Sequence, residues 1–243
     1  MKECLIIIPC YNEANRLIAA EFIEFAISHQ HFSFLFINDG STDQTLKVLE
    51  KIAIAPQINF LSFEKNVGKA EVVRKGILEG LKNNTYSYFA YLDADLAIPL
   101  EEFERLYKIT TDDSQYGFTF LSKIPRKDAE VNQPFKRYFI GRVLAFFNKV
   151  SLKLPIYDTQ CGCKIMTREV ATLISATPFI SAWLFDVEIF WRIINTYGRV
   201  YFSKHILEVP LNKLIERGPS SISGKSLLKL PFEYLKIHFA YKK

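Results

Sequence analysis

The chain has 243 residues, of which 49% are hydrophobic and 23% are charged, and its formal net charge is +5. This length suits one large domain or two small ones, and the composition excludes an intrinsically disordered protein. The modest positive charge is compatible with an anionic substrate or an anionic membrane surface, and we expect no nucleic-acid partner. The four cysteines lack the spacing of a zinc site, so we expect free thiols in a reducing compartment.

No stretch of the sequence is apolar over the roughly 18 residues that span a bilayer. The longest uncharged stretch, residues 170–185, is shorter and contains Pro178. The chain begins with a short apolar run that Pro9 ends, which predicts a strand rather than a signal peptide. We therefore expect a cytoplasmic protein, and any membrane contact would be peripheral and on the cytoplasmic face.

The first half of the chain alternates apolar runs with segments of helical periodicity. Strands are expected at residues 5–8, 32–37, 58–63 and 86–92. A helix is expected after each of them, the third at about residues 69–81 and the fourth beginning at Pro99. Ser41 lies three residues before Gln44, which predicts a capping box at the start of the second helix.

This alternation predicts an α/β fold with a Rossmann-like, mostly parallel central sheet that carries helices on both faces. In such sheets the ligand lies beyond the carboxyl ends of the strands. Polar clusters follow three of the predicted strands, at Tyr11-Asn12-Glu13, Asp39-Gly40-Ser41 and Asp93-Ala94-Asp95. Because these clusters meet at one edge of one sheet, together they indicate a binding site far more strongly than any of them alone.

The second half of the chain is less regular. Residues 115–122 have the pattern of a strand, and residues 123–136 are polar and charged with two prolines, which indicates a mobile loop. Residues 138–154 form an amphipathic segment, and residues 186–197 predict a helix that Gly198 ends. No linker or repeat divides the chain.

Asp93 and Asp95 are two carboxylates one residue apart, directly after a buried strand. Their charges repel each other unless a cation neutralises them. Mg²⁺ or Mn²⁺ often takes one or two carboxylates and completes its coordination with phosphate oxygens and water, and such a metal stabilises a departing diphosphate. The alternative is a surface turn, in which Asp is common. The position after an apolar strand favours the metal site.

Two further loops carry candidate binding residues. Asp39 is a candidate acceptor for the imide N–H of a pyrimidine base, with a simple turn residue as the alternative, and Gly40 allows a sharp turn there. Gly68 and Lys69 stand at a helix start, which suits a diphosphate, although this pair alone is a weak signal.

Four segments of the first half resemble the family-2 glycosyltransferases of the GT-A fold: Ile8-Pro9-Cys10-Tyr11-Asn12-Glu13, Asn38-Asp39-Gly40-Ser41-Thr42-Asp43, Asn66-Val67-Gly68-Lys69-Ala70 and Leu92-Asp93-Ala94-Asp95-Leu96. In that family the first two segments hold the nucleoside, and the Asp-x-Asp element holds the metal and the diphosphate. The resemblance implies Mg²⁺ or Mn²⁺ on Asp93 and Asp95. It implies that a nucleotide sugar binds at Pro9, Tyr11, Asn12, Glu13, Asp39, Gly40, Ser41, Gly68, Lys69, Asp93, Ala94 and Asp95.

Two segments of the second half, Asp158-Thr159-Gln160-Cys161-Gly162-Cys163-Lys164 and Trp183-Leu184-Phe185-Asp186-Val187-Glu188, look like motifs of the polyprenyl-phosphate glycosyltransferases, nearest to the dolichyl-phosphate glucosyltransferases. The resemblance covers residues 4–224. It implies a catalytic domain over residues 1–225, with a donor half at 1–115 and an acceptor half at 116–225. Residues 226–243 are then a C-terminal amphipathic helix that could face a membrane.

The resemblance implies an inverting transfer of a hexose to a polyprenyl phosphate, with UDP-glucose as the first expected donor and GDP-mannose as the second. A phosphate monoester is already largely ionised at neutral pH, so it needs positioning more than a base. Asp158 and Asp95 are the expected catalytic residues, Asp158 as a base or as an orienting carboxylate. The expected acceptor and phosphate contacts are Arg126, Arg137, Arg142, Asp186, Glu188 and Arg217, with Lys136 a further candidate.

Other interpretations remain open at this point. Each arginine has a solvated surface charge as its alternative, and acids at a helix start such as Asp186 and Glu188 are also favoured by the helix dipole. Trp183 is expected under the sugar or in the core. A soluble enzyme that acts on a sugar hydroxyl would need Asp158 or Glu188 as a base. A non-catalytic nucleotide-sugar scaffold is the least favoured function, and a homo-oligomer is left open.

Overall fold

The structure is a computed structural model, and it describes residues 3–126, 129–131, 141, 142, 145, 151–215 and 224–242. Within these residues the main sheet has seven strands in the order β3-β2-β1-β4-β7-β5-β8. Their bounds are β1 Glu3–Cys10, β2 Phe32–Asp39, β3 Ile58–Phe63, β4 Tyr86–Leu92, β5 Phe118–Ser122, β7 Cys163–Thr167 and β8 Ile206–Pro210. A second, two-stranded sheet pairs β6 (Glu130–Val131) with β9 (Lys213–Leu214).

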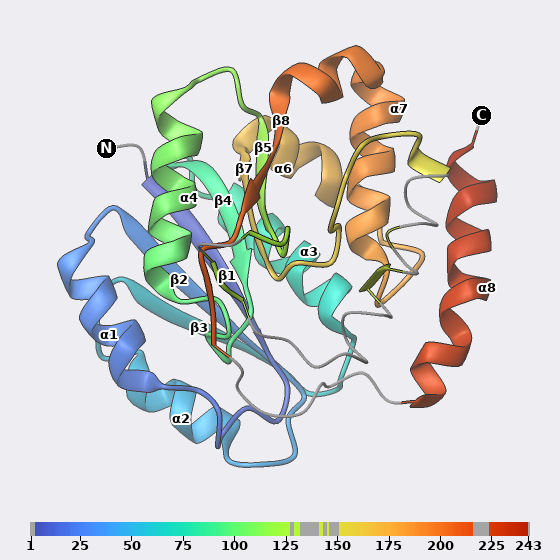
Figure 1. The fold of residues 1–243 in the computed structure, drawn as a ribbon. Coiled ribbons are helices and arrows are strands. Elements are labelled where there is room, and N and C mark those ends of the chain that lie inside the picture. Colours follow the sequence, from blue (N-terminus) through green and yellow to red (C-terminus); the bar gives the residue numbers. More distant parts are fainter. Residues whose placement is uncertain are drawn as a thin grey trace.

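Helices cover both faces of the main sheet, as Figure 1 shows. Their bounds are α1 Ala19–Ser28, α2 Thr45–Ile52, α3 Lys69–Leu81, α4 Leu100–Asp112, α6 Arg168–Ser175, α7 Phe185–His205 and α8 Gly224–Tyr241. One buried cluster joins the sheet to α1, α2 and α4, and a second joins it to α3, α6, α7 and α8. This two-faced α/β architecture is the one that the sequence predicts.

The sheet is mostly parallel, with one strand reversed. β1 pairs in parallel with both β2 and β4, and β5 pairs in parallel with β8. β7 lies between β4 and β5 and runs antiparallel to both, so that Leu92 faces Cys163 and Phe120 faces Lys164. β7 is not among the predicted strands, because a buried strand of five residues directly before a helix has too short a pattern to be recognised.

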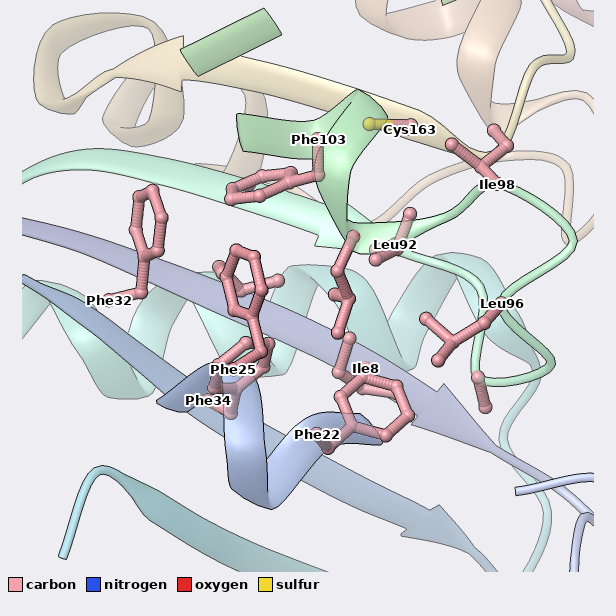
Figure 2. Packing of buried hydrophobic residues seen from close by; sticks show 14 of the residues in the cluster. Ile8, Phe22, Phe25, Phe32, Phe34, Leu92, Leu96, Ile98, Phe103 and Cys163 are labelled. Atoms are coloured by element: carbon pink, nitrogen blue, oxygen red, sulfur yellow. The ribbon is translucent and has the colours of Figure 1, made fainter. Parts of the chain in front are cut away.

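Neighbouring side chains of a strand point to opposite faces of the sheet and belong to different buried clusters. On β1, Ile8 belongs to the cluster under α1, whereas Ile7 belongs to the cluster under α3, as the two-residue period of a strand requires. Figure 2 shows Ile8 packed with Phe22, Leu92 and Leu96 on the first of these faces. Leu96 lies beyond β4, so the loop that carries Asp93 and Asp95 is itself anchored in the core.

One of two predictions about helix ends is wrong. Ser41 does not cap α2: the helix begins at Thr45 without a side-chain cap, and Ser41 Oγ instead accepts the amide N–H of Asn12. The prediction for α7 agrees with the structure at Gly198, where the backbone takes φ 81° and leaves the helical conformation, and a second helical segment then continues to His205. Glycine tolerates a positive φ, so it separates the two segments by a kink.

Some sequence predictions fall outside the described residues. These include half of the loop at 123–136 and most of the amphipathic segment at 138–154. Among the residues that are described, no helix has both the length and the apolar character needed to cross a membrane.

α3 approaches β1 closely because its inner face carries glycines. A Cβ on Gly76 would lie 2.7 Å from Cγ2 of Ile7 and 2.9 Å from Cδ1 of Ile37. We expect Gly76→Val to lower the free energy of unfolding by about 1–3 kcal/mol, because overpacking pushes α3 away from the sheet. Denaturant unfolding measures this loss. Leu78→Val, at a position of α3 that is 37% exposed, is the control and should cost much less; equal losses would contradict the close approach.

Candidate active site

The loops after β1 and β2 are joined by hydrogen bonds that involve the predicted donor residues. The N–H of Asn12 donates to Ser41 Oγ at 3.0 Å, and the side-chain oxygen of Asn12 accepts from the N–H of Thr42 at 2.9 Å. The N–H of Glu13 donates to Oγ1 of Thr45 at 2.8 Å. Asn12 has φ 56°, a conformation that Asn adopts more readily than most residues. The structure therefore brings Asn12, Glu13 and Ser41 together, as predicted, while Tyr11 beside them is 48% exposed.

Asp39 fixes the loop between β3 and α3. Its two carboxylate oxygens accept from the N–H groups of Val67 and Gly68 at 2.7 and 2.9 Å, and the residue is only 3% exposed. Gly40 has φ 64°, and a Cβ there would lie 2.6 Å from the N atom of Asn66. These contacts bring Gly68 next to Asp39. Contact of Asp39 with a base stays a prediction, and carboxylate oxygens have lone pairs left for it.

In the loop that begins with Asp93-Ala94-Asp95, partly exposed carboxylates alternate with buried apolar residues. Ala94 and Leu96 are 3% and 0% exposed, whereas the side chains of Asp93 and Asp95 are 44% and 19% exposed. The N–H of Asp93 donates to the carbonyl of Gly162 at 3.2 Å. A Cβ on Gly162 would overlap the carboxylate of Asp93, so a larger residue there would push this carboxylate out of its present position. The core thus holds both carboxylates toward the edge of the sheet.

Two cations stand against these carboxylates. Lys69 Nζ lies 2.5 Å from Oδ1 of Asp93, and an Nη atom of Arg16 lies 3.7 Å from Oδ2 of Asp95. Burial alone would lower the pKa of Lys69, but the charges of Asp93 and Asp186 outweigh it and raise that pKa. Lys69 is therefore a firmly charged ammonium at neutral pH. Arg16 also forms a two-point ion pair with Glu13, and burial raises the pKa of the Glu13 carboxyl despite that pair.

Asp158 lies in the turn that precedes β7, next to Lys123 at the end of β5. Lys123 Nζ is 3.4 Å from its Oδ2, and the N–H of Gln160 donates to its Oδ1 at 2.9 Å. Burial would raise the pKa of Asp158, but Lys123 and these amide contacts outweigh it and lower that pKa. Glu208 on β8 accepts the N–H groups of Tyr157 and Asp158 and fixes the turn. Asp158 is thus held ionised.

Asp186, at the start of α7, is buried beneath the site. It accepts the hydroxyl of Tyr91 and lies 2.9 Å from Nζ of Lys164, whose side chain is completely buried. Lys164 also donates to the carbonyl of Cys161 at 2.6 Å. These contacts of Asp186 and Lys164 connect the start of α7 and the end of β4 with the turn that holds Gly162. Its contacts are internal, so a role of Asp186 in phosphate binding stays a prediction.

Glu188, in the first turn of α7, faces the interior of the protein. Its carboxylate is fully buried and accepts the N–H groups of Ile180 and Ser181 and the hydroxyl of Tyr241. Arg192 lies 3.7 Å from it. These four contacts give Glu188 a structural role, and neither the base role nor the phosphate contact considered for it is supported by another observation.

The predicted basic residues divide into two groups. Arg142 donates to the carbonyl of Tyr157 at 2.7 Å and stacks on the Tyr157 ring, which places it beside Asp158. Arg126 is exposed and donates to Oδ1 of Asn212. Arg137 and Arg217, with Lys136, lie outside the described residues. Trp183 is partly buried, and its neighbour Ala182 would contact a Cβ on Gly68 at 3.5 Å, so its turn borders the predicted donor site.

The site presents two candidate metal ligands rather than a closed cage. No group of three or more His, Cys, Asp or Glu residues is arranged to hold a metal within the described part of the chain. Two carboxylates at an exposed edge fit a hard divalent cation whose remaining ligands are phosphate oxygens and water. The predicted pair, Asp93 and Asp95, is therefore a chemically suitable donor set for Mg²⁺ or Mn²⁺ shared with a diphosphate.

Three basic residues that form ion pairs with predicted site residues are not among the predicted ones. Arg16 lies three residues after Glu13, a spacing at which opposite charges pair, so its partner was detectable. Lys164 stands inside a motif that the sequence analysis quotes, but without a role. Lys123 gives no local signal, because its partner Asp158 is 35 residues away in the chain.

The Asp158 pair predicts a pH-dependent stability. A carboxyl whose pKa is lower in the folded chain stabilises the fold above the unfolded value, near 3.8, and this contribution is lost as pH falls through the native pKa. We expect Asp158→Asn to lower the free energy of unfolding at pH 7 by roughly 1–3 kcal/mol, and the difference from wild type to shrink steadily as pH falls below about 4. Thermal unfolding from pH 7 to pH 3 checks this, with exposed Asp112→Asn as the control. A difference that widens toward acid would contradict it.

The chain is similar in sequence to known proteins over nearly its whole length. The family model described as glycosyl transferase family 2 matches residues 5–173. A dolichyl-phosphate beta-glucosyltransferase of Dictyostelium discoideum is 31% identical, over 95% of this chain and 74% of that protein. The dolichyl-phosphate beta-glucosyltransferase of Homo sapiens is 27% identical, over 96% of this chain and 76% of that protein.

Solved structures show the same fold. Glucosyl-3-phosphoglycerate synthase from Mycobacterium tuberculosis, in complex with Mn²⁺, uridine-diphosphate and phosphoglyceric acid, matches with a TM-score of 0.69 at 15% identity and covers 98% of this chain and 78% of its own. A complex of the same enzyme with Mg²⁺ and uridine-diphosphate has a TM-score of 0.66 at 15% identity, over 98% and 80% of the two chains. These likenesses confirm the predicted GT-A fold. With the family match and the shared fold, the chain belongs to glycosyl transferase family 2 and is a glycosyltransferase.

Proposed function

We propose that this glycosyltransferase transfers glucose from UDP-glucose to a polyprenyl phosphate, with dolichyl phosphate as the reference acceptor and Mg²⁺ or Mn²⁺ as the cofactor. The observation that carries the donor half is the placement of Asp93 and Asp95 at the edge of the sheet, beside the start of α3. The names of the sequence relatives support glucose and the lipid phosphate, and the neighbours bound to Mn²⁺ or Mg²⁺ with uridine-diphosphate support the donor and the metal.

In this proposal the donor lies across the loops after β1, β2, β3 and β4. The loops that Asn12 and Asp39 tie together hold the nucleoside. Asp93 and Asp95 hold the metal, which neutralises the diphosphate as it leaves. Lys69 at the start of α3 adds a positive charge and a helix N-terminus, both of which stabilise an anion.

The state of Asp158 favours a phosphate acceptor over a sugar hydroxyl. Its pKa is lowered by Lys123, and a carboxylate with a lowered pKa is a weak base at neutral pH. A sugar hydroxyl needs a base, whereas an ionised phosphate does not. We infer that Asp158 orients the reaction centre and that Lys123 shields the acceptor charge. In the described residues, Nε2 of Gln160 is buried without a hydrogen-bond partner, so it is an available donor for a phosphate oxygen.

α8 supplies a surface that suits a membrane. Its outer side shows Phe232, Leu235 and Phe239, which are 70%, 51% and 74% exposed and lie within one stripe of the helix. Lys236 and Lys242 are exposed beside this stripe. Away from this stripe, Ile237 and Leu230 are buried and belong to the cluster that includes α7. Figure 1 shows α8 outside α7. We propose that this stripe inserts into the lipid interface with its lysines toward anionic headgroups.

The donor proposal predicts a strict dependence on Asp95. We expect purified protein with UDP-glucose, Mn²⁺ and dolichyl phosphate to yield lipid-linked glucose, and Asp95→Asn to reduce the rate about a thousandfold, since the metal contributes several kcal/mol to the transition state. Extraction of labelled lipid into organic solvent measures the product. Asp112→Asn, at the exposed C-terminal end of α4, is the matched control. Transfer from GDP-mannose but not UDP-glucose would overturn the choice of sugar, and no product from any donor would overturn the lipid acceptor.

The membrane proposal predicts binding to anionic vesicles. We expect the protein to float with phosphatidylglycerol vesicles at low salt, and the double variant Phe232→Ser/Phe239→Ser to lose most of this binding, because it removes the largest inserted groups. Vesicle flotation measures the bound fraction. Ile54→Ser removes an apolar side chain that is 77% exposed elsewhere on the surface and should change nothing. Equal effects of both changes, or no wild-type flotation, would exclude the stripe.

A further inference from the structure

Lys69 forms an ion pair with Asp93, one of the two carboxylates assigned to the metal. Its ammonium lies 2.5 Å from Oδ1 of Asp93, and Oδ2 of the same carboxylate lies against Gly162. A divalent cation that takes Oδ1 must therefore displace the ammonium or share the oxygen with it. Sharing is costly, because two positive charges would then lie within a few ångströms of each other.

Lys69 stands where its ammonium could also bind a diphosphate at the start of α3. Lys69 is the first residue of α3, and Gly68 before it adopts φ 89° at the helix N-terminus. Free N–H groups at a helix N-terminus attract phosphate oxygens. A lysine ammonium is a compact charge on a flexible stem, and this side chain is one-third exposed. The same ammonium can thus reach either Asp93 or a diphosphate bound at the start of α3.

Arg16 is not equivalent, although it stands against the other carboxylate. Its guanidinium makes two hydrogen bonds to Glu13, at 2.8 and 2.5 Å, and is 3.7 Å from Asp95. Asp95 also accepts the N–H of Ala97 at 3.1 Å. Arg16 has its own partner whether or not Asp95 binds a metal, whereas Lys69 depends on Asp93.

We propose that Lys69 is an exchangeable cation. Without nucleotide its ion pair with Asp93 keeps this carboxylate from binding the metal, and the donor diphosphate attracts Lys69 away and leaves Asp93 free to bind the metal. This inference rests on the proposed donor and metal. It makes Lys69 a positioning residue that couples the two ligands. Because binding couplings are reciprocal, nucleotide strengthens metal binding through Lys69 by the same factor by which metal strengthens nucleotide binding.

The test is a thermodynamic cycle on Mn²⁺ and UDP. Calorimetry, or electron paramagnetic resonance of free Mn²⁺, gives the Mn²⁺ dissociation constant with and without saturating UDP, and the UDP dissociation constant with and without Mn²⁺. We expect Lys69→Met to bind Mn²⁺ alone about fivefold more tightly than wild type, as expected for freeing a carboxylate from a partly exposed ion pair. We expect the same variant to bind UDP about tenfold more weakly in Mn²⁺, so that the coupling factor falls.

Two controls separate exchange from a general change of charge. Lys123→Met removes a positive charge from the same edge, but one paired with Asp158, and should strengthen Mn²⁺ binding much less. Lys69→Arg keeps the charge and should keep Mn²⁺ binding weak without UDP. Circular dichroism confirms that each variant is folded.

The outcomes distinguish this inference from the proposed function. Mn²⁺ binding that is unchanged or weaker in Lys69→Met, with UDP binding still metal-dependent, would overturn the exchange and leave the proposed donor site standing. An increase matched by Lys123→Met would also overturn the exchange, since it would reflect charge alone. Absence of UDP binding to the wild-type protein would overturn the proposed donor instead.

Discussion

The site depends on one close contact between two distant parts of the chain. The N–H of Asp93 donates to the carbonyl of Gly162, and a side chain at Gly162 would displace the Asp93 carboxylate. This contact exists because β7 runs antiparallel beside β4, with Cys163 opposite Leu92. It places the turn that carries Asp158 directly against the Asp93-Ala94-Asp95 loop. The proposed donor and acceptor sides therefore share their positioning, which the buried Lys164 reinforces by holding Asp186 and the Cys161 carbonyl.

Much of the donor half is predictable from the sequence because its causes are local. Parallel strands end at the same edge, so polar residues directly after apolar runs, such as Asp39 and Asp93, must lie near one another. The structure agrees: α3 spans Lys69–Leu81 and β4 spans Tyr86–Leu92, as the patterns predict. Ser41 shows the limit of local reasoning. Its spacing to Gln44 is that of a cap, but its hydroxyl is used by Asn12 on another loop.

The acceptor half is less predictable because its partners are far apart in sequence. Asp158 is ionised by Lys123 and fixed by Glu208, and neither residue is near it in the chain. Glu188 belongs to a motif with an apparent chemical role, yet its carboxylate binds the amides of Ile180 and Ser181 inside the protein. A sequence pattern shows that a residue is an acid; only the packing shows whether its charge faces a substrate or the interior.

The reversed strand β7 also has a consequence for how the protein is made. Leu92 and its partner Cys163 are separated by about 70 residues, and ribosomes add roughly 5–20 residues per second, so β4 waits about 4–14 seconds for its neighbour. During that interval its edge is an apolar strand with unpaired N–H and C=O groups, which invites pairing with other chains. Because the segment that closes this edge belongs to the acceptor half, the donor half depends on later synthesis to complete its sheet.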